Sequence, residues 1–139
     1  MSKKSFSLNL GAASLLALSS FLASAADSKV DTSKLPPASE KKSVTFAADI
    51  KPIFEKASCF KCHGPEKQKA KLRVDSLEAV LKGSEDNKIL VPGKSAESIL
   101  VISVARLVED DAMPPADKGD PLTKDQIGLV RAWIDQGAK

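Results

Sequence analysis

The most regular pattern of hydrophobic and polar positions lies at the C-terminal end of the chain. Ile127, Val130 and Ile134 recur at the three- and four-residue spacing that places side chains on one face of a helix. Thr123 opens the Thr-x-x-Gln pattern of a capping box, in which two side chains bond free N–H groups of the first turn. The pattern therefore predicts a helix that begins after Thr123 and ends at Gly137.

Three shorter helices are predicted earlier in the chain, over residues 46–57, 77–82 and 98–108. The first begins near Phe46 or Asp49. A start near Ala48 or Asp49 is favoured, because Pro52 fits only the first turn of a helix, where its missing N–H leaves no bond unmade. Ser76 is a suitable N-cap for the second helix, and Gly83 is a suitable end. The third has many β-branched residues, which lower its helix propensity.

Together these helices predict an all-α domain at residues 44–139, with long loops at 64–76 and 83–97. The whole sequence has 139 residues, with five Phe, one Trp and no Tyr. A domain of this size with so few aromatic side chains is marginal on burial alone, and such domains often gain stability from a cofactor. The composition therefore favours a fold packed on a bound apolar group.

The N-terminal part of the chain has a different composition. Residues 1–25 have a short positive start, an uncharged apolar stretch and small residues at 23–25, as in a secretory signal peptide cleaved before Ala26. The alternative is a retained membrane anchor, but the apolar stretch is short and rich in Ser and Ala. Residues 26–43 are rich in Lys, Ser, Asp and Pro, which predicts a flexible or extended linker. We therefore expect a periplasmic or otherwise exported protein with no membrane span after cleavage.

Both cysteines of the chain stand beside its only histidine, in Cys59-Phe60-Lys61-Cys62-His63. Cys-x-x-Cys-His is the sequence that attaches a c-type haem: two thiols form thioethers with the haem vinyl groups, and the adjacent imidazole binds the iron. The motif predicts one haem c, bound covalently through Cys59 and Cys62 with His63 as the proximal iron ligand. Such haem is added after export, which agrees with the predicted signal peptide.

Three other uses of this motif are possible in principle. A thioredoxin-like Cys-x-x-Cys would lie near a βαβ unit, and the sequence has no such pattern. A structural zinc site needs four ligands, and only three suitable residues stand here. A disulfide between the two cysteines would close a very small loop and stabilise little. The haem interpretation is favoured over all three.

Met113 is the candidate for the second axial position on the iron. No second histidine exists, and Met113 is the only methionine left once Met1 is removed with the signal peptide. Pro114 and Pro115 follow it and stiffen the loop, because proline restricts φ. The alternative is that Met113 fills a gap in the core as an ordinary apolar residue.

The ligand set bears on function. Iron with a histidine and a methionine has no open position, and the thioether raises the potential, as in electron-carrying cytochromes. The sequence therefore predicts a single-electron carrier that is not an enzyme in its own right. One alternative is a haem-based sensor or ligand-binding module in which Met113 dissociates, and another is a structural haem.

The chain resembles the planctomycete-type cytochrome c domain over nearly all of residues 44–139. The matching stretches are residues 46–54, 59–65, 72–76, 91–93, 113–115 and 122–138. The resemblance implies a cytochrome c-like helical fold packed around one covalent haem, with Cys59 and Cys62 bonded to it and His63 and Met113 on the iron. The partners it implies are redox proteins, such as a membrane or periplasmic oxidoreductase.

Charge argues against a nucleic acid partner. The net charge is only +3, and no basic patch alternates with aromatic residues. Residues 51–73 hold seven basic and two acidic residues, whereas residues 109–120 hold five acidic and one basic. One interpretation is a charge dipole that orients a redox partner, and the other is a pair of ordinary solvated surfaces.

Two contacts around the haem are also expected. Arg73 is a candidate partner for a haem propionate, because its forked donors suit a carboxylate. The second ring nitrogen of His63 needs a carbonyl or carboxylate to orient it, and Pro65, Pro92 and their neighbours are candidates.

Overall fold

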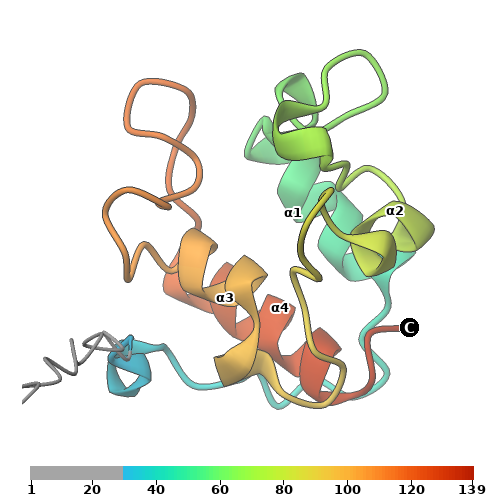
Figure 1. Ribbon diagram of the computed structural model, residues 1–139. Coiled ribbons are helices and arrows are strands. Elements are labelled where there is room, and N and C mark those ends of the chain that lie inside the picture. Colours follow the sequence, from blue (N-terminus) through green and yellow to red (C-terminus); the bar gives the residue numbers. More distant parts are fainter. Residues whose placement is uncertain (1–29) are drawn as a thin grey trace, which may run out of the picture.

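The computed structural model describes residues 30–139, and the signal peptide predicted at residues 1–25 lies outside the described residues. The described part of the chain is helical and contains no strand (Figure 1). Its α-helices are α1 (Lys51–Lys56), α2 (Leu77–Lys82), α3 (Ile99–Val104) and α4 (Lys124–Asp135). The predicted all-α architecture is therefore confirmed for residues 30–139. No helix in that range is long and apolar enough to cross a membrane.

Helix α4 forms as the sequence predicts. The Thr123 hydroxyl accepts the Gln126 N–H at 3.2 Å, and the Gln126 side-chain oxygen accepts the Thr123 N–H at 2.8 Å, which completes the capping box. The chain leaves α4 through Gly137, whose φ of +101° lies in the left-handed region. Local signals at both ends explain why this helix could be predicted closely.

Helix α1 follows a wider turn. A π-helical segment at Phe46–Ile50 comes first, capped by the Thr45 hydroxyl, which accepts the Ala48 N–H at 3.3 Å. The Lys51 N–H donates to the Phe46 carbonyl, five residues back, and Pro52 then lies in the first turn of α1. Helical structure thus begins at Phe46, earlier than the favoured start at Ala48 or Asp49, because a π turn precedes α1 and brings Pro52 to a position where it breaks no hydrogen bond.

Helices α2 and α3 differ in how well the pattern predicted them. Helix α2 matches its predicted bounds, with the Ser76 hydroxyl accepting the Ala79 N–H at 3.3 Å and Gly83 at a φ of +85°. Helix α3 ends at Val104, four residues before the predicted end at 108. The reason is Arg106, whose φ of +56° reverses the chain.

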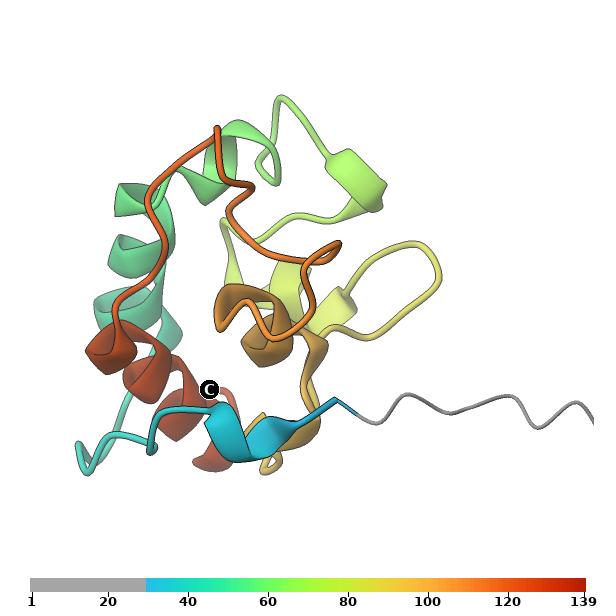
Figure 2. The same cartoon turned by 90° about the vertical axis from the view of Figure 1, so that its left-hand side faces the viewer.

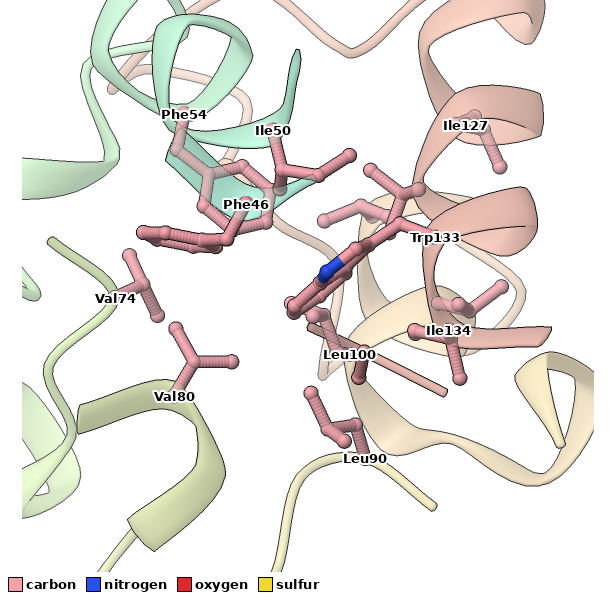
Figure 3. Close-up of a cluster of buried hydrophobic side chains, with 14 of the residues drawn as sticks. Phe46, Ile50, Phe54, Val74, Val80, Leu90, Leu100, Ile127, Trp133 and Ile134 are labelled. Atoms are coloured by element: carbon pink, nitrogen blue, oxygen red, sulfur yellow. The ribbon is translucent and has the colours of Figure 1, made fainter. Parts of the chain in front are cut away.

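The core lies where all four α-helices meet, around Trp133, as Figure 3 shows. The Trp133 side chain is fully buried, and its ring centroid lies 5.6 Å from that of Phe46. Phe46 in turn meets Phe54 edge to face at 6.4 Å. The indole N–H donates to the Lys139 carbonyl at 2.9 Å, so the one polar atom of this large side chain is satisfied.

Part of the segment predicted as a flexible linker is held against α4. We call residues 35–44 the N-terminal strap; it runs past α4 in an extended conformation (Figure 2). Leu35 is buried, and the Ser39 N–H donates to the Gly128 carbonyl at 2.9 Å. The Gln136 side chain joins Lys41 and Val44 by two further bonds. The extended course is one of the two predicted alternatives, but these contacts have no periodic signature, so the attachment to α4 could not be predicted from the sequence.

Gly128 allows the N-terminal strap to approach α4 closely. A Cβ atom at this position would lie 2.7 Å from the Pro37 carbonyl oxygen, which is closer than side-chain carbons approach backbone atoms. Alanine is a better helix former than glycine by about 1 kcal/mol, yet here it must push the strap outward. Gly128 therefore serves packing at the expense of helix propensity.

We expect Gly128→Ala to release the N-terminal strap. The clash with the strap costs about 1–3 kcal/mol and the gain in helix propensity offsets about 1 kcal/mol, so the net loss of stability is about 1 kcal/mol. Hydrogen exchange at the Ser39 amide should become at least about fivefold faster. The Val80 amide in α2, which bonds to Ser76 at 3.0 Å, is the internal reference. Unchanged exchange at Ser39 would contradict the role assigned to Gly128.

Candidate functional site

The two cysteines lie in a short turn directly after α1. Ser58, at a φ of +62°, reverses the chain into a 3₁₀ turn at Cys59–Lys61. The Cys59 carbonyl accepts the N–H groups of Cys62 at 3.2 Å and His63 at 2.9 Å. These bonds gather two thiols and one imidazole on a single compact turn.

Gly64 is required by the path of the chain after this turn. A Cβ atom at this position would lie 2.3 Å from the Phe60 carbonyl oxygen, so no other residue fits without displacement of the backbone. Gly64 was not predicted from the sequence as part of the site. A glycine directly after the only histidine was the available signal.

The imidazole of His63 is oriented by a backbone carbonyl. Its Nδ1 lies 3.1 Å from the Lys69 carbonyl oxygen, so Nδ1 carries the proton and Nε2 keeps its lone pair. The loop is held around the ring by bonds from the Lys69 N–H to Cys62 and from the Val74 N–H to His63. The acceptor is a carbonyl, as predicted, but it belongs to Lys69 and not to the candidates Pro65 or Pro92.

Burial lowers the pKa of His63, and the nearby backbone of Leu72 and Lys69 partly opposes this shift. The ring is therefore neutral at neutral pH. A neutral imidazole with one nitrogen already hydrogen-bonded is the form that binds a metal.

Met113 lies on the other segment that forms the site. The loop after α3 and the loop after α1 extend at the same end of the molecule, in orange and green in Figure 1. The Met113 N–H donates to the Ser103 carbonyl at 3.0 Å, and the Met113–Pro114 peptide bond is cis. The half-buried Met113 side chain packs against the core.

An apolar cavity joins the two segments. Two adjoining hollows, of about 180 and 160 Å³, share Cys59, His63, Ala70, Val104 and Met113 as lining residues. The larger hollow is also lined by Cys62, Pro114, Pro115, Lys118 and Leu122, and the smaller one by Phe54, Leu72, Val74 and Leu100. The structure thus brings Cys59, Cys62, His63 and Met113 to one cavity; their bonds to haem and iron stay predictions.

Comparison with known proteins identifies the part of the chain that carries these residues. Residues 59–117 match the family described as Planctomycete cytochrome C. This segment is a planctomycete-type cytochrome c domain. The match begins at Cys59 and includes His63 and Met113, so all four candidate residues lie within it. No curated protein and no solved structure matches the chain significantly.

The site of this cytochrome c domain suits haem chemically. It offers two thiols, one neutral imidazole with its second nitrogen held, one thioether and a mostly hydrocarbon lining. A porphyrin is a broad apolar plate around an iron ion that takes nitrogen and sulfur ligands. The residues present therefore fit the haem c that the family implies.

The structure gives no support to the three other uses of the Cys-x-x-Cys-His motif, which are a redox-active thiol pair, a disulfide and a zinc site. Burial raises the pKa of the Cys59 thiol to about 11, whereas a reactive redox thiol needs a lowered pKa. Cys59 and Cys62 are not joined by a disulfide. Within residues 30–139 no group of three or more His, Cys, Asp and Glu side chains is arranged to hold a metal ion.

Arg73 pairs with a neighbouring carboxylate in the cytochrome domain. Its guanidinium pairs with Asp75 through two bonds, at 2.9 Å from Nε and 2.7 Å from Nη2, and Arg73 does not line the cavity. This pair lowers the pKa of Asp75. The guanidinium is thus held by a carboxylate two residues away, and a contact of Arg73 with a haem propionate stays a prediction.

The basic and acidic segments of the cytochrome domain approach each other at the cavity. Lys69, from the basic segment, and Lys118, from the acidic one, both line the larger hollow. Lys118 pairs with Asp117 at 2.5 Å, and Asp117 also experiences the charge of Lys69. A charge dipole needs the basic and acidic segments to be well separated, and their proximity here reduces that separation. The effect of these charges on a redox partner stays a prediction.

Proposed function

We propose that this cytochrome c domain carries single electrons between redox proteins through one covalently bound haem, with His63 and Met113 as axial ligands. The observation that supports the proposal is that these two residues, from different loops, line the same apolar cavity beside Cys59 and Cys62. A histidine and a methionine directed at one small cavity form the ligand set of electron-carrying c-type cytochromes.

Each residue has a distinct task in this proposal. Cys59 and Cys62 would hold the haem by thioether bonds, and the Lys69 carbonyl would keep Nε2 of His63 directed at the metal. The iron of the bound haem would supply the chemistry, a change of one electron between ferric and ferrous forms. The apolar lining would exclude water, which limits the reorganisation that accompanies this change and supports fast transfer.

The proposal extends to enzyme activity, partners and location. With both axial positions filled by Met113 and His63, the domain would have no position for a substrate, so it would act as a carrier and not as an enzyme. Its partners would be redox proteins, such as a membrane or periplasmic oxidoreductase. The family and the signal-like composition of residues 1–25 support a periplasmic or otherwise exported location.

The experiment that tests the function uses the full chain matured with haem. We expect a ferric spectrum with the weak far-red band of a methionine–iron bond, and no spectral change when carbon monoxide is added to the reduced protein. Both results follow if His63 and Met113 leave no free coordination position on the iron. A missing band together with rapid carbon monoxide binding would reject the carrier and favour the sensor, in which Met113 dissociates.

A further inference from the structure

The turn that ends α3 has an unusual residue at its central position. The Leu107 N–H donates to the Ile102 carbonyl at 3.1 Å, and the Arg106 N–H donates to the Ser103 carbonyl at 3.0 Å. This pair of bonds is the Schellman motif, in which the left-handed residue is usually glycine because a Cβ atom is strained there. Here that residue is Arg106, at a φ of +56°. A long side chain in a position that favours glycine calls for a compensating contact.

The compensating contact reaches the loop that carries Met113. The guanidinium of Arg106 donates from Nη1 to the Pro114 carbonyl at 2.8 Å. Within residues 30–139 Arg106 takes part in no ion pair, although Glu109, Asp110 and Asp111 follow closely in sequence. Its charge is therefore directed at one backbone oxygen, and hydrogen bonds from a charged donor are the stronger kind.

Both described hydrogen bonds that tie this loop to α3 come from the same turn. The Ser103 carbonyl accepts the N–H of Met113 at 3.0 Å, and Arg106 holds the carbonyl of the next residue, Pro114. The other described backbone bonds of the loop, from Ala112 to Glu109 and from Lys118 to Pro115, are internal to it. The position of the Met113 side chain in the cavity thus depends on the end of α3.

We propose that Arg106 is a positioning residue that holds the sulfur of Met113 in the cavity through the Pro114 carbonyl. The proposal rests on the proposed function, because it takes Met113 as the iron ligand. Arg106 is not among the residues that line the cavity, so it acts through the loop backbone. Glycine would form the same turn without strain, but it has no guanidinium to donate to the Pro114 carbonyl. This contact explains why arginine occupies a strained position.

The test separates positioning from folding by replacing Arg106 with the residue that the turn prefers. Arg106→Gly keeps the Schellman turn and removes its strain, so the midpoint of thermal unfolding should stay within a few degrees or rise. The far-red band should weaken, and reduced protein should bind carbon monoxide about tenfold faster or more. The reason is that the variant loses the charged hydrogen bond that holds the Met113 loop against the end of α3. Arg106→Lys, which keeps a donor, should restore part of the band.

A second comparison shows whether the effect passes through the methionine. In a Met113→Ala background, Arg106→Gly should leave the rate of carbon monoxide binding unchanged within about twofold. If Arg106→Gly alters that rate equally in both backgrounds, or leaves the band intact in the otherwise native chain, the positioning role is wrong. If Met113→Ala itself changes neither band nor binding, the proposed function fails first, whatever Arg106 does.

Discussion

Met113→Ala should abolish the far-red band of the ferric protein, open the iron to carbon monoxide and lower the reduction potential. Axial ligands tune haem potentials over about 0.8 V, so removal of the thioether should lower the potential on the order of 100 mV. Haem attachment should persist, because Cys59 and Cys62 lie on a different loop that is closed by its own hydrogen bonds. Absorption spectra and a redox titration of the matured protein measure these changes.

Met113→Leu is the matched control for packing. Leucine has a volume close to that of methionine, so the half-buried side chain keeps its contacts while the sulfur is removed. We expect the same loss of the band and a similar fall in potential as with alanine, but little loss of stability. A leucine variant that keeps both the band and the potential would show that Met113 is a gap-filling residue of the core.

Trp133→Ala should have the largest effect on stability. The side chain is fully buried between Phe46 and the C-terminal residues, and truncation of a buried Trp to Ala costs about 3–5 kcal/mol. The whole domain is stabilised by only about 5–15 kcal/mol. The Lys139 carbonyl also loses the indole N–H that bonds to it at 2.9 Å. Unfolding in guanidinium chloride, followed by circular dichroism, should show a much lower midpoint.

Val91→Ala is the control for that measurement. Val91 is 38% exposed, so its truncation should change the free energy of unfolding by less than about 1 kcal/mol. Trp133 does not line the cavity, and at temperatures where the variant remains folded its far-red band should persist. A Trp133 variant as stable as the Val91 variant would contradict the assignment of Trp133 as the centre of the core.

The residues of the site were predictable to different degrees. Cys59, Cys62 and His63 form a contiguous motif whose chemistry needs that spacing, and Met113 followed from elimination and from the two prolines after it. The structure adds that these four residues line one cavity. It also pairs Arg73 with Asp75, a carboxylate two residues away that is within reach of two guanidinium nitrogens.

The sequence by itself determined the helical class, the bounds of α2 and α4 and the haem-binding motif, because caps, periodicity and the motif act over a few neighbouring residues. Only the tertiary structure decided the early end of α3, the docking of the N-terminal strap and the orientation of His63 and Met113. These depend on backbone groups: the Gly128 carbonyl, the Lys69 carbonyl, and the Ser103 and Pro114 carbonyls. Every residue has a carbonyl, so no residue type in the sequence marks the ones that fold into contact.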